Sequence, residues 1–559
     1  MQSMDRRSFL GLGVAGAPAL AAEISRRIES EQRYLNRKTG ANPFRFRMPA
    51  KRPHIFLISL DMVSPDHYHP SRTLHRAMEL PAIRSLIRDS VFFTNAFCTA
   101  PLCAPARASL ATGRYTYITA NGERAHDGHE TILRPTDVIF QEYLKASGYR
   151  TKHAGKGHLG TQKFIDAFDE NAAAWDRWAP PLQDDEVYRD YLRRLNVKPQ
   201  RYKREILALQ QDRQTTYSSL GGWIEQSDGR PFPMEAQYTH YLIDRAISKL
   251  DSALEDGGPV YLQIDIFDPH QPFSIPAGFE QRERELRKAF RLPRSYERVR
   301  ETDWRAWPDQ PKIYDFYRKV WGLYRPETVM DYRVANALQM EVIDKALGRF
   351  LKVLKDRGLY EDALIVFTAD HGEMNGRQAL VDKGVYLYPD ILRVPLAIKM
   401  PGVKPRSIDS PVSHLDLAPT LLEIAGVETP ARLDGQSLLP LLRGEKEGGD
   451  RELLFECGWH VGVNFACGFQ HWSPSGEHYL YAYNLSSPVD ELYDLRSDDP
   501  ENLAGKPKFT HVRRDMIERL GAFLQRDARW LGYWHSFRID HYHDLPKRTE
   551  SDAQMVRPI

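Results

Sequence analysis

Largely apolar runs recur along the chain, separated by segments of helical periodicity. The runs lie at residues 55–60, 260–266 and 363–368. Apolar stretches of this length are typical of strands buried on both faces of a parallel sheet. Between them, apolar residues return every three or four positions, as from 238 to 254 and from 334 to 357, which predicts helices. The alternation predicts an α/β fold, with a large doubly wound mixed or parallel sheet flanked by helices.

Two of these strands are followed by an aspartate. Asp61 comes directly after the first run, and Asp370 comes after the last. In open α/β sheets, ligands bind beyond the carboxyl ends of the strands. We therefore expect the two carboxylates to share one site although they are far apart in the sequence.

The pattern also suggests how the chain is divided. Residues 161–236 and 275–325 interrupt the alternation with tryptophans, prolines and charges, so we interpret them as insertions in a catalytic domain over residues 51–444. From about residue 445 the strands and turns become shorter, which predicts a smaller C-terminal α+β domain at 445–545 and a tail at 546–559.

The first 21 residues predict an export signal. Arg6 and Arg7 precede a short apolar run that ends at Ala19-Leu20-Ala21, as in a cleavable signal peptide. The adjacent arginines resemble the twin-arginine type, and the run is too short to span a bilayer. We interpret 22–50 as a linker and expect a periplasmic or secreted mature protein with no membrane insertion.

Composition narrows the function classes without naming one. Lys plus Arg (77) nearly balance Asp plus Glu (75), for a net charge of +2, so no global field favours nucleic acid as a partner. Four cysteines are too few for a disulfide framework. Cys457 and Cys467 could pair in an oxidising compartment, but spacing alone leaves this open.

The most informative segment runs from Pro101 to Arg114. Pro105 suits the first turn of a helix, and Gly113 suits its end. Cys103 is then expected at a helix N-terminus, where backbone N–H groups and the helix dipole favour negative charge. A lone cysteine is more often a small buried apolar residue, so its neighbours have to decide its role.

The residues around Cys103 form a motif. Cys-x-Pro-x-Arg, which ends at Arg107, is followed by Ala-Ser-Leu-x-Thr-Gly-Arg. This pattern resembles the signature of type I sulfatases, members of the alkaline phosphatase superfamily, and the resemblance continues in order from Ile55 to about Leu503. It implies an alkaline phosphatase-like fold, and it implies that a formylglycine-generating maturation enzyme converts Cys103 to formylglycine.

The resemblance also implies one bound Ca²⁺, or Mg²⁺ or Mn²⁺ in its place. Its ligands would be Asp61, Asp370, His371 and the group at Cys103. Carboxylates suit such hard cations. These sulfatases usually carry a second acidic residue or Gln after the first aspartate, where this chain has Met62. A thioether is a poor ligand for a hard cation, so the ion has one protein ligand fewer, or takes water or another group; Asp66 is a candidate substitute or outer carboxylate.

Four further residues match positions of the family's active site. In Gly-Lys-Gly-His, where Gly157 replaces the family's Trp, the resemblance implies that Lys156 contacts the formylglycine hydrate and the sulfate. His158 would then deprotonate the hydroxyl that releases sulfate. His270, in Pro-His-Gln-Pro-Phe, is implied to protonate the ester oxygen, and Lys383 to bind sulfate.

These implications predict a sulfuric ester hydrolase that cleaves a sulfate monoester through formylglycine. The aromatic residues of the insertions favour a sulfated carbohydrate as substrate, ahead of small alkyl or aryl sulfates. Two alternatives stay open. One is a phosphonate monoester or phosphodiester hydrolase on the same site. The other is a non-catalytic exported binding protein in which Cys103 is unmodified and Met62 is a sign of decay.

Overall fold

The computed structural model describes most of the chain. The described residues are 52–115, 126–127, 130–131, 133, 137–159, 162–182, 184–209, 216–301, 309–321, 325–428, 433–473 and 476–541. The expected signal at 1–21, the linker at 22–50 and the tail at 546–559 lie outside them. The described residues up to Arg519 belong to one compact unit, and the described residues from Leu520 on belong to a second one. No helix within the described ranges is both long and apolar enough for a transmembrane span.

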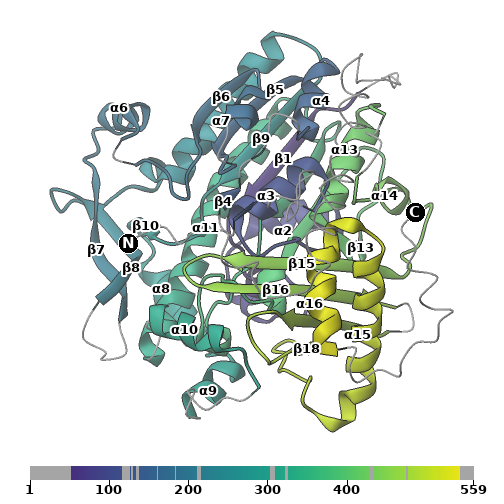
Figure 1. The fold of residues 1–559 in the computed structure, drawn as a ribbon. Coiled ribbons are helices and arrows are strands. Elements are labelled where there is room, and N and C mark those ends of the chain that lie inside the picture. The colour runs from purple at the N-terminus through teal and green to yellow at the C-terminus, as the bar shows by residue number, and fades with distance from the viewer. Residues whose placement is uncertain are drawn as a thin grey trace, which may run out of the picture. The chain divides into compact units, whose positions relative to one another are not determined.

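A nine-stranded sheet forms the centre of the fold (Figure 1). Its strand order is β13-β2-β12-β11-β1-β9-β5-β6, and β14 also pairs with β2. The bounds are β1 (Ile55–Leu60), β2 (Val91–Phe97), β5 (Arg150–Lys156), β6 (Glu170–Trp175), β9 (Val260–Ile266), β11 (Leu364–Ala369), β12 (Arg393–Lys399), β13 (Arg406–Ile408) and β14 (Val412–Ser413). The strands from β11 to β6 are parallel, and β12 is antiparallel to both of its neighbours. The predicted mixed α/β sheet is confirmed.

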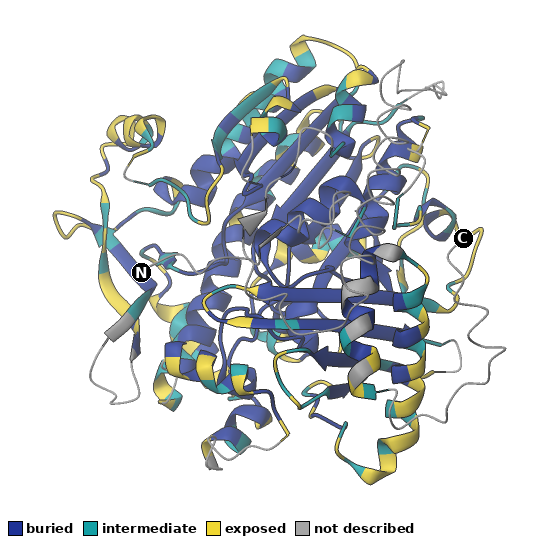
Figure 2. Cartoon of the chain, viewed as in Figure 1, coloured by how far each residue is buried: buried dark blue, intermediate teal, exposed yellow. Residues whose placement is uncertain are grey.

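Helices flank this sheet. They include α2 (Pro81–Arg88), α3 (Cys103–Thr112), α4 (Phe140–Ala146), α7 (Tyr238–Glu255), α11 (Pro326–Asp356) and α13 (Leu417–Ile424). Every residue of β1, β9 and β11 is buried (Figure 2), which accounts for their apolar runs. The helix predicted from residue 334 begins earlier, because Pro326 occupies its first turn, where a proline needs no hydrogen-bond partner.

Part of the first insertion belongs to the main sheet. Its segment Glu170–Trp175 pairs with β5 as the edge strand of the main sheet, so the chain leaves the sheet only after Trp175. It then forms α6 (Glu186–Arg194) and the long hairpin of β7 (Gln200–Leu209) and β8 (Thr216–Gln226), which projects from the left of Figure 1. Strand β10 (Phe273–Ile275) pairs with β8. Gly221 has φ 77° there, and a Cβ on it would lie 2.1 Å from the backbone nitrogen of Phe273, so this crossing requires glycine.

The second insertion is helical, and a separate sheet follows towards the C-terminus. The insertion contains α8 (Glu280–Ala289), α9 (Arg294–Glu301) and α10 (Lys312–Trp321). The separate sheet is antiparallel, in the order β15 (Arg451–Trp459), β16 (Val463–Trp472), β17 (His478–Asn484) and β18 (Glu491–Asp494). Helices α15 (Thr510–Gln525) and α16 (Leu531–His541) follow in the sequence.

The two cysteines of this small sheet are not bonded to each other. Cys457 is opposite Ala466, and Cys467 is opposite Glu456. Successive side chains of a strand point to opposite faces, so the two thiols lie on opposite faces of the sheet. All four cysteines of the chain are outside disulfides, and the pairing left open by the sequence is not made.

Candidate active site

Helix α3 presents Cys103 to the carboxyl end of the main sheet. Cys103 is the first residue of the helix, Leu102 before it is extended, and Gly113 (φ 66°) ends the helix with an N–H bond to the Ser109 carbonyl. Every residue of α3 is buried. The Cys103 sulfur lies 3.3 Å from Nε2 of His371 and 3.7 Å from Oδ1 of Asp61. The predicted helix N-terminus is therefore in contact with the predicted metal ligands.

Asp61 and Asp370 meet because their strands are neighbours. Strands β1 and β11 are parallel, with Leu60 opposite Ala369, so both aspartates leave the sheet at the same edge. Ligand atoms of Asp61, Cys103, Asp370 and His371 all lie within 4.8 Å of one another, and all four residues are buried. Two carboxylates and an imidazole that converge in this way fit a divalent cation.

Positive charges hold the outer sides of both carboxylates. Arg107 donates from Nε to Oδ2 of Asp370 at 3.0 Å, and Nζ of Lys156 donates to Oδ2 of Asp61. Burial raises the pKa of Asp61, but the surrounding cations outweigh it and hold that pKa below its usual value. The pKa of Asp370 is raised by burial and by the charge of Asp61. These opposite directions follow from two buried carboxylates sharing one site.

Arg107 is itself held by a carboxylate that the motifs did not reveal. Its Nη1 donates to Oδ1 of Asp265 at 3.1 Å. The other oxygen of Asp265 lies 3.0 Å from Nε2 of His153 and accepts a bond of 2.8 Å from Gln263. The signal in the sequence was a pair of polar residues, two positions apart, inside the apolar run at 260–266. Residues so spaced share one face of a strand.

His270 and Lys383 form a second contact pair in the site. Nζ of Lys383 lies 2.7 Å from Nε2 of His270 and donates to Asp382 at 3.2 Å. Burial lowers the pKa of Lys383, but Asp382 and other negative groups outweigh it and raise that pKa. The His270 ring stacks on Phe267, with centroids 5.1 Å apart. Lys156 lies over the same Phe267 ring, with Nζ 5.5 Å from its centroid.

Two site residues have unusual backbone conformations. His158 has φ 55° and is 4% exposed, and hydrogen bonds from Gly157 to Trp175 and from Leu159 to Asp176 hold the backbone on either side of it. Met62 has φ 64°, and its N–H donates to Oδ1 of Asp370 at 3.0 Å. Such strained residues persist where the surroundings fix them, often at functional sites.

Asp66 forms hydrogen bonds and ion pairs outside the proposed metal site. It accepts from Arg377 at 2.7 Å and from Asn375 at 3.1 Å, and it pairs with Arg333 at 3.3 Å. These contacts lower the pKa of its buried carboxyl well below the usual range. Asp66 therefore belongs to a buried arginine network and does not replace the acidic ligand missing at Met62; at that position the structure places a backbone N–H.

The sheet, the helix N-terminus and the converging carboxylates define a hydrolase of the alkaline phosphatase superfamily. Residues 53–427 match the family described as Sulfatase, and residues 376–526 match the C-terminal region of N-sulphoglucosamine sulphohydrolase. The chain belongs to the sulfatase family, and it is a sulfuric ester hydrolase.

Similar proteins include named sulfatases. An uncharacterized sulfatase of Escherichia coli (strain K12) is 26% identical over 79% of this chain and 82% of its own length. The ulvan-active sulfatase of Formosa agariphila is 26% identical over 80% of this chain and 76% of its own length. Among solved structures, a phosphonate monoester hydrolase from Silicibacter pomeroyi has a TM-score of 0.63 at 21% identity, covering 89% of this chain and 98% of its own.

Proposed function

We propose that the protein hydrolyses a sulfate monoester of a carbohydrate, using formylglycine formed from Cys103 and one bound divalent cation. The observation that carries this proposal is the placement of Cys103. It begins a buried helix, and it lies within contact distance of His371 and Asp61. The relatives named as sulfatases support the reaction class, and the ulvan-active enzyme supports a carbohydrate substrate.

The group at position 103 would supply the nucleophile. A hydrated aldehyde there carries two hydroxyls, one to attack the sulfur atom and one to expel sulfate afterwards. Arg107 and the helix N-terminus stabilise negative charge at this position. Nη2 of Arg107 makes no hydrogen bond within the described residues and lies 3.7 Å from Asp61. It is therefore available to an oxygen of the substrate or of the nucleophile.

The oxygens of the sulfuryl group need cations around them. Lys156 and Lys383 are both buried in the site, where charge interactions are stronger than in water. Asp61, Asp370, His371 and the group at Cys103 would hold Ca²⁺, Mg²⁺ or Mn²⁺. When bound, such an ion acts as a Lewis acid that polarises the sulfuryl oxygens.

Proton transfers complete the reaction. The S–O bond to the alcohol breaks, and His270, in contact with Lys383, gives the leaving oxygen its proton. His158 would then accept the proton of the remaining hydroxyl at position 103, so that the C–O bond to sulfate breaks, sulfate leaves and the aldehyde forms again. The predicted signal at 1–21 makes export to the periplasm or the medium part of this proposal.

Replacement of Cys103 tests the proposal. We expect Cys103→Ala to abolish hydrolysis of nitrophenyl sulfate with an unchanged unfolding midpoint, and Cys98→Ala, a matched change at another buried cysteine, to retain activity. The tryptic peptide that contains Cys103 should have the mass of the aldehyde. A thiol mass in fully active protein, or activity in Cys103→Ala, would contradict the proposal.

Hydrolysis of a phosphonate monoester or phosphodiester is the second candidate. The cations of Lys156, Lys383 and Arg107 face any tetrahedral oxyanion alike, so the geometry does not separate sulfuryl from phosphoryl transfer. Nitrophenyl sulfate and nitrophenyl phenylphosphonate should be compared in the same preparation. We expect the higher kcat/KM for the sulfate, and the reverse order would favour the second candidate.

A further inference from the structure

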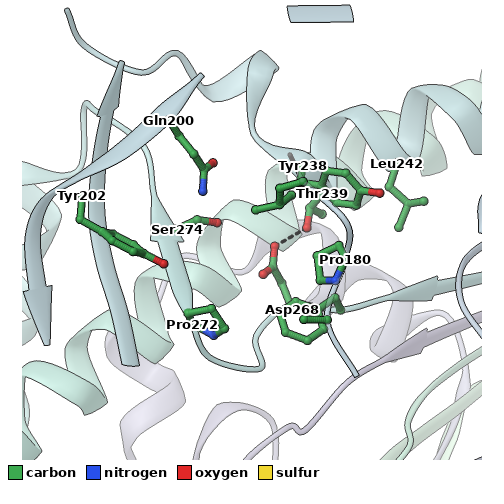
Figure 3. Close-up of a pocket in the computed structure, with 12 residues that line it drawn as sticks. Pro180, Gln200, Tyr202, Tyr238, Thr239, Leu242, Asp268, Pro272 and Ser274 are labelled. Carbon is green, nitrogen blue, oxygen red and sulfur yellow. Dashed lines mark hydrogen bonds between the residues drawn. The ribbon is translucent and has the colours of Figure 1, made fainter. Parts of the chain in front are cut away.

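A pocket lies between the first insertion, α7 and the segment that follows β9 (Figure 3). Its cavity volume is about 70 Å³, and since about 10–15 Å³ of such space holds one water, it has room for several waters or one small ring. Residues from the loop after β6, from β7, from α7 and from the segment after β9 line it: Ala179, Pro180, Leu182, Gln200, Tyr202, Tyr238, Thr239, Leu242, Phe267, Asp268, Pro272 and Ser274.

Trp178 lies close to a residue of the pocket and to a residue of the site. The Trp178 ring lies 6.4 Å from the ring of Phe267, which lines the pocket, and 6.2 Å from the ring of His270. Trp178 is 51% exposed, although it sits in this aromatic cluster. An aromatic cluster of Trp178, Phe267 and His270 therefore connects a wall of the pocket to the proposed proton donor.

The walls combine aromatic faces with polar groups. Gln200 and Tyr202 project from β7 towards Asp268 and Ser274 in Figure 3. Asp268 is 5% exposed and accepts hydrogen bonds from Thr239 and from Gln237. Sugar rings present apolar faces and hydroxyl edges, and aromatic side chains with nearby polar groups match both.

The charge of the pocket separates it from the sulfate site. Among the described residues that line the pocket, none is Lys, Arg or His, and Asp268 is the acidic one. A second sulfate or a carboxylate would lose its hydration there without gaining a cation. The occupant that fits is an uncharged ring.

We propose that this pocket binds an unsulfated, uncharged sugar ring that is joined to the sulfated ring. The sulfated ring then lies against Trp178 in front of His270, and the substrate is an oligosaccharide, not a monosaccharide. This proposal rests on the proposed function, and it adds the substrate's length and the charge of its second ring.

The test compares chain lengths in kinetics. The substrates are sulfated galactose, neocarrabiose sulfate, whose second ring carries neither sulfate nor carboxylate, and nitrophenyl sulfate as the small reference. We expect the wild type to cleave the disaccharide with kcat/KM about tenfold or more above the monosaccharide. Gln200→Ala and Tyr202→Ala should remove this preference and leave the rate on nitrophenyl sulfate unchanged. Leu207→Ala, at a 37% exposed position of the same strand, should keep it.

Two outcomes overturn the proposal. One is the same length preference in the wild type and in both pocket variants, and the other is a preference for disaccharides with a sulfate on the second ring. Calorimetric titration of neocarrabiose sulfate into Cys103→Ala protein, with and without Tyr202→Ala, decides the matter independently of turnover. If no sulfate ester is cleaved, the proposed function fails, while an unchanged Kd in Tyr202→Ala means that the pocket proposal fails.

Discussion

Nζ of Lys383 lies 2.7 Å from Nε2 of His270, although one residue follows β9 and the other lies in the loop after β11. The two side chains can share one proton between them. Because Asp382 and other negative groups favour the charged form of Lys383, this lysine keeps its proton and remains a cation beside the His270 ring. The pair thus places the proposed proton donor in contact with a proposed sulfate-binding residue.

The pair predicts a dependence on the leaving group. We expect His270→Ala to lower kcat for an alkyl or sugar sulfate by about 10²- to 10⁴-fold, because the departing alkoxide needs a proton. The loss on nitrophenyl sulfate should be much smaller, since that phenolate leaves without one. Steady-state kinetics on the two substrate types measure this difference. Equal losses on both would assign His270 a structural role, and Lys352→Ala, an exposed lysine, serves as a surface control.

Asp265 is expected to position Arg107. Asp265→Asn leaves Arg107 without one carboxylate partner in a buried site, and breaking a buried ion pair costs about 3–5 kcal/mol. Urea unfolding should show a loss of this order, and kcat should fall because Arg107 is no longer fixed. Asp256→Asn is the control, because Asp256 pairs with Lys152 but its own side chain is exposed. There we expect a loss of unfolding free energy of about 1 kcal/mol or less. If Asp265→Asn matches that control, Asp265 does not hold Arg107 in place.

The converging ligands predict metal dependence. Treatment with a chelator should abolish hydrolysis and lower the Tm, and Ca²⁺ should restore both, with Mg²⁺ and Mn²⁺ tested beside it. A site occupied at 100 times its Kd adds about 2.7 kcal/mol to stability. In Asp370→Asn protein the metal should no longer shift the Tm. A Tm and activity that the chelator leaves untouched would exclude this metal site.

His67 predicts a loss of stability in acid. Burial lowers its pKa to about 4, whereas the unfolded chain titrates near 6.5. The unfolded state therefore binds one more proton between these values. The contribution of His67 is fully present above pH about 6.5 and falls by about 3 kcal/mol as the pH decreases to about 4.

The variant His67→Asn removes this titration. Unfolding free energies measured by urea from pH about 4 to 7.5 should differ in slope between the wild type and the variant by up to about 1.4 kcal/mol per pH unit. Other buried histidines, such as His478, act in the same direction in both proteins and cancel in the comparison. Parallel pH profiles would show that His67 is charged in the folded protein or titrates normally.

Much of the architecture could be predicted from local patterns. Buried parallel strands leave apolar runs, so β1 and β11 were visible, and the aspartates after them were expected at one edge of the sheet. The start and end of α3 followed from Pro105 and Gly113. These features depend on short stretches of sequence, where the physical cause and the pattern coincide.

What could not be predicted depends on long-range pairing. The edge strand β6 lies in a segment that reads as an insertion, because an edge strand is less uniformly buried. The ion pairs of Asp66 with Arg377 and Arg333 join a segment after β1 to a segment after β11 and to helix α11, and no sequence spacing predicts them. The pocket near Trp178 combines residues from four separate segments, so it could not be predicted before the fold was known.

The complete burial of Cys103 limits when this residue can be modified relative to folding. An enzyme that modifies this residue needs access to it, and α3 offers none once the central sheet has closed around it. The conversion proposed for Cys103 would therefore precede folding, and the predicted twin-arginine signal, of a type that exports folded proteins, would carry a protein whose catalytic group is already complete. Protein that folds before it is modified would keep its thiol. The fraction of active protein would then depend on the rate of modification relative to the rate of folding.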